Sequence, residues 1–412
     1  MTRSAVMADF AVRVLTQDSE LRAAHSLLRV ALHSPPMTDS DWAATKPTYK
    51  PDRFFGAITT DGVTVGSAYV YDSEVAVPGG KTVPMSGLTR VGVRADHRRR
   101  GVLTELMRFQ FADARANGQI LSTLNATETG IYGRFGYGIG TRAREMHLIK
   151  PRLRSGVPQS GRVRMLSSAE ALALTAALYE RIGLYRTGMM TRGRDWWAVH
   201  FDRSMREDEP YLVAVHSGPD GGDDAYVIYK ASSNEDHVST EYGATLHVYD
   251  LHGTTLAARN QLWRFLIEMD LVNEIHAHDR PVDEPVELLL ENPRACITRN
   301  IGDDAWVRLV DVPAALGART YTDAEPVAIA VNDAFLPENS GTYLVSGDGV
   351  VRTSAPADLT LGVDTLGMLY FGAWTPSALA AAGRVRVSDP VALTRADRLF
   401  QTDSIPWCGT GF

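Results

Sequence analysis

Residues 98–103 combine three cationic side chains, a glycine and the start of an apolar segment, in the order "RRRGVL". A guanidinium can form two parallel hydrogen bonds with a phosphate, and a glycine lets a ligand approach the backbone closely. At the start of a helix, unpaired amide groups and the helix dipole add to the attraction for anions. A solvated run of charge is the other interpretation. The residues that we expect to hold an anion are Arg98, Arg99, Arg100, Gly101, Val102 and Leu103.

The pattern around this turn predicts the elements that would position it. Three aromatic or β-branched segments precede the arginines, and the turn signals Asp61-Gly62 and Pro78-Gly79-Gly80 separate them. After Gly101, apolar side chains recur on one helical face, and Gly118 stands where such a helix would end. We expect strands over residues 54–60, 64–77 and 85–93, a helix after Gly101, and a fourth strand over 119–127. This position between a strand and a helix favours the anion site.

A second segment, "GIYGRFGYG" at residues 130–138, places tyrosines among closely spaced glycines. A phenol has a pKa of about 10, close to that of an alkyl thiol, so Tyr132 could pass a proton to a departing thiolate with little penalty. The alternative is that Tyr132, Phe135 and Tyr137 are core aromatic residues between turns. The residues alone leave both interpretations open.

Together, "RRRGVL" after "VGVRADH" and the segment "GIYGRFGYG" resemble the mycobacterial Eis aminoglycoside acetyltransferases of the GNAT superfamily. Leu103 departs from the Gly or Ala that is usual in the superfamily's loop. The resemblance runs through the whole chain and is strongest over residues 85–140. It implies an N-acetyltransferase that uses acetyl-coenzyme A and has Tyr132 as its general acid. The cofactor's diphosphate would then lie on the arginine turn.

The pantetheine arm of such a cofactor is strand-like, so it would pair with the exposed edge of a strand. We expect it along Val91, Gly92 and Val93, where the glycine would permit close approach and a backbone N–H near Val93 would polarise the thioester carbonyl. Asn125 and Thr127, at the end of the fourth expected strand, complete the expected cofactor contacts.

The chain ends in "WCGTGF", where bulky Trp407 and Phe412 bracket a glycine-rich tail as if it were tucked into a pocket. A frayed or ordinarily packed end is the alternative. The resemblance implies that the terminal carboxylate of Phe412 acts as the base toward the amine. An α-carboxyl group has a reference pKa of about 3.5 and is a poor base unless desolvation raises it. A relay through water and electrostatic positioning of the amine remain equally open.

The resemblance further implies aminoglycosides or related polyamines as acceptors, with lysine side chains as another possibility. Family members carry an acidic residue just before the final Phe, but this chain has Gly411. Asp39 and Asp41 beside Trp42 could compensate, because a tryptophan face also attracts an amine through a cation–π contact. A surface loop is the alternative interpretation of these acidic residues.

The remaining two-thirds of the chain predict two further domains. A linker at 151–161, a capping box from Ser167 to Glu170 and a strand–strand–helix–strand pattern indicate a second GNAT-like unit without a cofactor site. Its elements are expected at residues 224–231, 243–251, 254–270 and 285–290. The last domain, with a helix around Pro376 to Ala382, is similar to the sterol-carrier-like domain that closes Eis proteins. We expect an α+β fold with domains at 1–150, 151–300 and 301–412. A non-catalytic lipid-binding protein is the alternative function.

Composition excludes several function classes. With 412 residues, 44% hydrophobic content and a formal charge of −7, we expect no nucleic-acid partner. No apolar run approaches about 18 residues and the first residues do not resemble a secretory signal, so we expect no membrane span. Cys296 and Cys408, far apart, indicate a reducing compartment such as the cytoplasm, with export left open. His276 and His278 share a strand face without further ligands nearby, so no metal is expected. The resemblance also implies a homohexamer.

Overall fold

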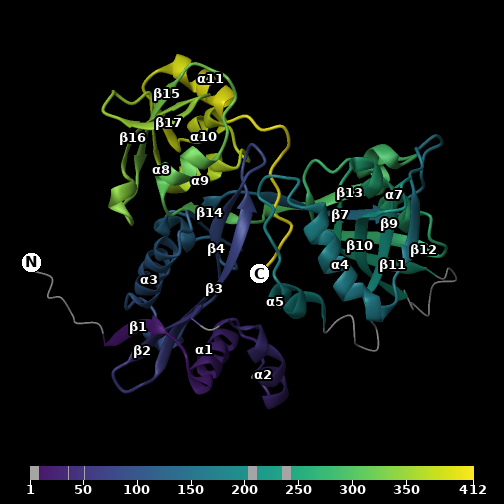
Figure 1. Ribbon diagram of the computed structural model, residues 1–412, viewed down its shortest axis with the longest axis horizontal. Coiled ribbons are helices and arrows are strands. Elements are labelled where there is room, and N and C mark those ends of the chain that lie inside the picture. The colour runs from purple at the N-terminus through teal and green to yellow at the C-terminus, as the bar shows by residue number, and fades with distance from the viewer. Residues whose placement is uncertain (1–8, 36, 51, 203–210, 234–242) are drawn as a thin grey trace, which may run out of the picture.

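The computed structural model describes residues 9–35, 37–50, 52–202, 211–233 and 243–412. It contains three sheets with flanking helices, and the carboxyl terminus lies between them (Figure 1). This is the α+β architecture expected from the sequence.

The first sheet has seven strands and carries the arginine turn. Its spatial order is β1 (Phe10–Val14), β2 (Phe54–Thr59), β3 (Thr64–Ala76), β4 (Thr82–Val93), β5 (Leu121–Leu124), β14 (Trp306–Leu309) and β6 (Gly138–Ile139). The associated helices are α1 (Asp18–Ala31), α2 (Asp39–Thr45), α3 (Val102–Ala116), η1 (Lys46–Thr48), η2 (Ala95–His97) and η3 (Tyr132–Phe135). The expected three strands, helix and fourth strand are all present.

Strands β4 and β5 run parallel but separate after a short ladder. Their paired residues are Met85 with Leu121, Ser86 with Ser122, and Gly87 with Thr123. Beyond Gly87, residues 88–93 of β4 pair only with β3 among the described strands. We call the point after Gly87 and Thr123 the strand fork. The fork leaves one edge of β4 available for an extended ligand.

The second sheet is covered on its two faces by α4 (Ser168–Ile182) and α7 (Leu256–Ile267). Its strand order is β13 (Cys296–Asp303), β7 (Arg142–Ile149), β12 (Val272–Pro281), β11 (Ala244–Gly253), β10 (Asp223–Ser233), β9 (Leu212–Ser217) and β8 (Arg162–Met165). The shorter helices here are α5 (Arg194–Trp197), η4 (Ala198–Asp202), η5 (Val286–Leu289) and η6 (Pro293–Ala295). Helix α4 begins with the predicted capping box, because Ser167 and Glu170 satisfy each other's backbone groups.

One predicted element of this domain is wrong. Residues 285–290 were expected to form a strand, but Val286–Leu289 is a short 3₁₀ helix. It follows Pro285 and buries Val286 and Leu289, three positions apart, in the core beneath α7. The strand that follows α7 is β12 instead. A short apolar run is compatible with either state, and only the available core surface decides between them.

The third sheet packs into one core with the first. Its strand order is β17 (Gly349–Thr353), β16 (Gly341–Ser346), β15 (Val327–Asn332), β18 (Leu359–Gly362) and β19 (Val385–Val387). The helices are α8 (Val312–Ala318), α9 (Val363–Tyr370), α10 (Pro376–Ala381), α11 (Pro390–Leu399) and η7 (Pro337–Asn339). One apolar cluster joins Val83 and Met85 of β4 with Val307 of β14 and Leu366 of α9. The domain that ends the chain is therefore fixed against the strands that form the fork.

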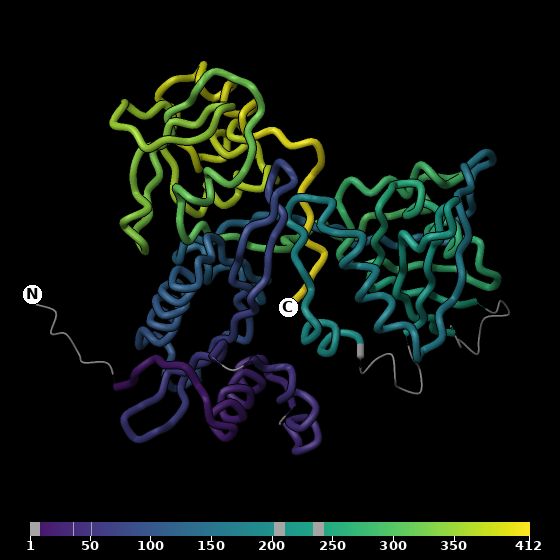
Figure 2. Tube along the Cα trace, viewed as in Figure 1, coloured from purple at the N-terminus to yellow at the C-terminus, as the bar shows by residue number. Residues whose placement is uncertain are grey.

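The sheets do not divide the chain at the expected boundaries of 150 and 300. Strand β7, before residue 150, belongs to the second sheet, and β14, after residue 300, returns to the first sheet between β5 and β6. In Figure 2 the yellow C-terminal segment passes between the β3–β4 hairpin and the second sheet. The first sheet is thus completed by a strand about 180 residues after β5.

Candidate active site

The backbone of the arginine turn is open at the start of a helix. Arg99 has a φ of 61° and Gly101 a φ of 86°, and Gly101 caps the amino end of α3. A Cβ atom on Gly101 would meet nothing within 4 Å, so the space above the turn is open. The side chains of Arg98, Arg99 and Arg100 are exposed, and none forms an ion pair within the described part of the chain. The turn therefore combines open backbone at a helix start with three available cations.

The β4 edge expected to hold a strand-like ligand is bulged. Residues Arg90 and Val91 together face one residue of β3, and Arg90 has a φ of 52°. A bulge of this kind re-aims the strand that contains it. Val91 and Val93 are partly buried on the core side of α3.

The structure gives a reason for the glycine at position 92 that differs from the expected approach of a ligand. A Cβ atom there would lie 2.9 Å from Cδ2 of Leu27 and 3.3 Å from Cα of Leu28. Glycine at this position thus lets α1 pack closely on β4. The space that a side chain would fill lies toward the protein interior and is occupied by α1, so the glycine does not by itself make room for a ligand.

Tyr132 begins η3 and is partly buried beside the aromatic core of the first domain. Its ring lies edge-on to that of Tyr137, with 6.0 Å between the centroids. Burial raises the pKa of Tyr132 to about 12, and the charge of Glu128 adds to the shift. The phenol is therefore protonated at neutral pH, which suits a proton donor.

Glycines around Tyr132 are required by the C-terminal domain. A Cβ atom on Gly136, whose φ is 86°, would lie 2.7 Å from Cγ1 of Val363. On Gly138 it would collide with the carbonyl oxygen of Asp364 at 2.0 Å. The spacing of "GIYGRFGYG" thus reflects close packing of α9 as well as any chemistry at Tyr132.

A buried network of hydrogen bonds joins the tyrosine segment to β4, β5 and α3. The hydroxyl of Tyr137 lies 2.7 Å from Oγ of Ser122, and Nε2 of Gln110 donates to Oγ of Ser86 at 2.9 Å and to Oγ of Ser122 at 3.2 Å. Because Ser86 and Ser122 are paired across β4 and β5, the network fastens both strands just before the strand fork. Of the two tyrosines, Tyr137 is the core residue, with 1% exposure.

The chain terminus is packed at the strand fork. The backbone N–H of Phe412 donates to Oδ1 of Asn125 at 3.2 Å. Its ring meets that of Tyr71 edge-on, with 6.2 Å between the centroids. A Cβ atom on Gly87, the last β4 residue paired with β5, would lie 3.2 Å from Cε2 of Phe412. The packed end agrees with the tucked tail that Trp407 and Phe412 suggested.

Asn125 and Thr127 follow β5 but differ in their surroundings. Besides Phe412, Asn125 contacts the backbone of Asp304, to which its Nδ2 donates at 2.9 Å. Thr127 is exposed in a bend. Sequence reasoning missed the contact between Asn125 and the terminus because 287 residues separate the partners.

The expected substrate residues lie at the start of α2 and in the core. Asp41 and Thr38 form a capping box, and Asp39 forms an ion pair with Arg22. Trp42 is 6% exposed and packs its ring 6.1 Å from that of Tyr49. The same cluster includes Tyr71 and reaches Phe412, so Trp42 supports the site from within the core.

His276 of β12 has more neighbours that could bind a metal than the sequence indicated. His147, Glu274 and His276 place their ligand atoms within 4.8 Å of one another. Glu274 accepts from Nε2 of His147 at 2.8 Å, while Nη2 of Arg299 lies 2.7 Å from Nδ1 of the same ring. The arginine can only donate, so Nδ1 of this ring is the acceptor and Nε2 carries the proton that is donated to Glu274. The His147 ring is therefore a neutral imidazole that is hydrogen-bonded to Glu274 and Arg299. The expectation that no further ligands lie nearby was wrong for His276, because His147 and Glu274 are beside it.

Figure 1 shows helices of modest length, and none in the described residues is long and apolar enough to cross a membrane.

Three segments of the chain match known domain families in the order expected from the sequence. Residues 11–140 and 188–309 each match an acetyltransferase (GNAT) domain, and residues 312–409 match the sterol carrier protein domain.

Relatives cover most of this chain. An uncharacterized N-acetyltransferase of Streptomyces avermitilis is 40% identical over 370 residues, which are 88% of this chain and 90% of the relative. The N-acetyltransferase Eis of Mycobacterium bovis is 32% identical over 357 residues, 82% of this chain and 83% of that protein. The crystal structure of Eis1 from Mycobacterium abscessus superposes with a TM-score of 0.89 at 35% identity, covering 98% of this chain and 100% of that one. With two GNAT domains, a sterol carrier protein domain and these relatives, the chain belongs to the Eis family and is an N-acetyltransferase.

Proposed function

We propose that the protein transfers an acetyl group from acetyl-coenzyme A to a primary amine, with the reaction centre at the strand fork. The observation that carries this proposal is the position of Phe412, which packs against Gly87 where the ladder between β4 and β5 ends. This packing of the Phe412 ring and N–H supports a role for its carboxylate beside the free edge of β4. The Eis relatives support the reaction class.

The described residues fit the cofactor at two places. The open turn at Gly101, with Arg98 and Arg99 exposed beside it, suits a diphosphate. Residues 91–93 lie on the part of β4 that β5 leaves unpaired, which suits a strand-like pantetheine arm. When bound, acetyl-coenzyme A supplies an acetyl group activated as a thioester.

Tyr132 and Phe412 would move the two protons of the reaction. In this reaction the amine nitrogen would form a bond to the acetyl carbon as the bond from that carbon to sulfur breaks, which would give an amide and a thiol. The Phe412 carboxylate, directly or through water, accepts the proton that the amine loses. The Tyr132 hydroxyl, kept protonated by burial, donates its proton to the departing sulfur.

The acceptor we propose is a polyamine such as an aminoglycoside, with lysine side chains of proteins as the second class. Asp39 and Asp41 at the start of α2 would attract its ammonium groups, because Gly411 supplies no carboxylate beside the terminus. Both cysteines are free, which supports action in a reducing compartment such as the cytoplasm. The homohexamer implied by the resemblance is testable by sedimentation.

A thiol-release assay tests the proposal. The protein is mixed with acetyl-coenzyme A and kanamycin, spermidine or a lysine peptide, and each product is read by mass. Thiol release with a mass gain of one acetyl group on an amine is the expected result. Absence of release with every amine, together with binding of a fluorescent fatty acid, would favour the lipid-binding alternative.

A further inference from the structure

The last six residues are held by side chains that come from far apart in the sequence. Asp304, between β13 and β14, accepts through one oxygen from the backbone N–H of Cys408 at 2.9 Å and of Gly409 at 3.2 Å. Burial raises the pKa of this carboxyl to about 6, so it is ionised at neutral pH and is a strong acceptor.

Arg192 and Trp196, on the second domain, hold residues 409–411. Nη2 of Arg192 donates to the carbonyl oxygen of Gly409 at 2.7 Å, and its Nε donates to Oγ1 of Thr410 at 3.1 Å. Nε1 of Trp196 donates to the carbonyl oxygen of Gly411 at 2.7 Å. Hydrogen bonds thus reach residues 408–411 in succession, and Asn125 holds the N–H of Phe412.

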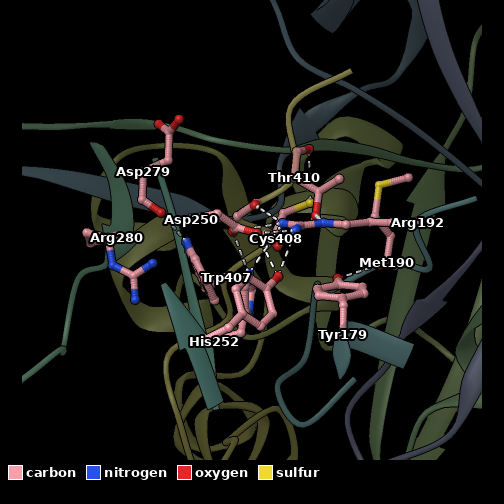
Figure 3. Close-up of polar contacts among 12 residues, drawn as sticks. Tyr179, Met190, Arg192, Asp250, His252, Asp279, Arg280, Trp407, Cys408 and Thr410 are labelled. Atoms are coloured by element: carbon pink, nitrogen blue, oxygen red, sulfur yellow. Dashed lines mark hydrogen bonds and ion pairs between the residues drawn. The ribbon is translucent and has the colours of Figure 1, made fainter. Parts of the chain in front are cut away.

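Arg192 is itself locked in place, as Figure 3 shows. Its Nη1 lies 2.6 Å from Oδ2 of Asp250, which also accepts from the Tyr226 hydroxyl at 2.7 Å. Burial alone would raise the pKa of Asp250, but the adjacent guanidinium outweighs this and holds that pKa well below its ordinary value. The guanidinium lies over the rings of Tyr179, 4.2 Å from the centroid, and Trp196, 4.3 Å from the centroid. Burying such an ion pair costs desolvation free energy, so it adds little net stability. It does fix the orientation of the Arg192 side chain, which suits a positioning role.

Trp407 anchors the start of the same segment. Its ring is 1% exposed and stacks on His252 with 5.1 Å between the centroids, and its Nε1 donates to the carbonyl oxygen of Asp279 at 2.7 Å. From this fixed point only five residues lead to the terminus. A glycine-flanked chain end ordinarily frays, so these contacts must offset the entropy of ordering it.

We propose that Arg192, Trp196 and Asp304 form a tail clamp that sets the position of the Phe412 carboxylate, so that they are positioning residues for the acetyl transfer. The second GNAT domain thereby contributes to catalysis by positioning the terminus. This inference rests on the proposed function, since a positioned carboxylate matters for turnover only if Phe412 takes part in the reaction.

Trp196→Phe is the sharpest variant, because it keeps a ring over Arg192 and removes only the donor to Gly411. Arg192 itself is less suitable, since its loss would leave Asp250 as an unpaired buried charge. We expect kcat to fall about tenfold, as one hydrogen bond of this kind warrants, with an unchanged KM for acetyl-coenzyme A. Trp197→Phe is the matched control, because Trp197 is buried beside Trp196 and, within the described residues, forms no hydrogen bond with the tail.

Release of Phe412 by a carboxypeptidase that prefers aromatic ends provides a readout independent of activity. The Trp196→Phe protein, still folded by its circular dichroism and Tm, should lose Phe412 about tenfold faster than the wild type and the Trp197→Phe protein. Thr410→Val, which removes the acceptor for Nε of Arg192, should act in the same direction. Wild-type rates of release and turnover in both clamp variants would overturn the tail clamp.

Failure of the proposed function gives a different result. If a chain that lacks Phe412 turns over at the wild-type rate, the terminus is not the base and the proposed mechanism is wrong. The rates of Phe412 release then still show whether the clamp holds the tail. Faster release from the Trp196→Phe protein than from the wild type would support a structural clamp without a catalytic role. Equal rates of release would reject the clamp altogether.

Discussion

The ring of Phe412 lies against the bare backbone of Gly87, where an added Cβ would be only 3.2 Å from Cε2. Gly87 is the last β4 residue paired with β5, so the final residue of the chain touches the strand fork directly. A side chain on Gly87 and the terminus compete for one space.

Gly87→Val should therefore displace the terminus, because Cβ of Tyr71 on β3, 3.3 Å from the added Cβ, also confines the new side chain. We expect kcat to fall by about tenfold or more, if the displaced carboxylate loses its orientation. Gly302→Val, in β13, is the control: a Cβ there meets only Nδ2 of Asn300, at 3.4 Å. Steady-state kinetics on both variants checks this, and equal activities would show that the terminus tolerates displacement.

Replacement of Tyr132 by phenylalanine removes a hydroxyl and preserves the ring packed against Tyr137. Loss of a general acid typically lowers turnover by about 10²–10⁴-fold, so kcat should fall within this range while the Kd of coenzyme A, measured by calorimetry, stays constant. Tyr137→Phe removes a hydroxyl that serves the buried network instead, and its main effect should be a lower Tm. A Tyr132→Phe enzyme with wild-type kcat would remove the phenol from the mechanism.

The exposed arginines of the turn should contribute to cofactor affinity and not to the chemical step. We expect the Arg98→Ala, Arg99→Ala double variant to raise the KM for acetyl-coenzyme A about tenfold, with kcat unchanged, since its hydrogen bonds to phosphate are charge-assisted. Arg108→Ala on α3, where the side chain pairs with Glu105, is the matched control. Added salt should lower the affinity of the wild type for acetyl-coenzyme A more than it lowers the affinity of the double variant. Identical salt dependence would place the diphosphate elsewhere.

His25 predicts how stability responds to acid. It is 6% exposed next to Tyr49, and burial, with the charges of Arg90 and Arg29, lowers its pKa to about 4 despite the opposing charge of Asp41. The imidazole of His25 binds a proton more readily in the unfolded chain than in the folded protein. The contribution of neutral His25 to the free energy of unfolding is therefore fully present above about pH 6.5 and is lost as the pH falls toward 4.

Urea unfolding at pH 7 and pH 4.5 measures this effect. The loss of unfolding free energy between the two pH values should be smaller in His25→Gln than in the wild type by about 2 kcal/mol. His33→Gln, at an exposed position, is the control. An equal loss in His25→Gln and the wild type would mean that His25 is not buried in its neutral form.

The chemistry-bearing segments were predictable because their signals are local. Gly101 at the amino end of α3 and the capping box at Ser167 each concern backbone groups within a few residues, and both are present as predicted. The strand predicted at residues 285–290 was wrong because a short apolar run takes the conformation that the surrounding core allows. The packing of Gly92 could not be predicted for a related reason: a side chain there would meet α1, which precedes it by some 60 residues.

The sequence by itself determined the order of the three domains, the arginine turn before α3 and the tyrosine segment, because periodicity, caps and turns are written in neighbouring residues. Only the tertiary structure decided that β14 completes the first sheet, that Asn125 meets Phe412, and that Arg192 and Asp304 hold the tail. These contacts join residues more than 100 positions apart. Their partners are selected by shared burial and hydrogen-bond satisfaction, which no local pattern encodes.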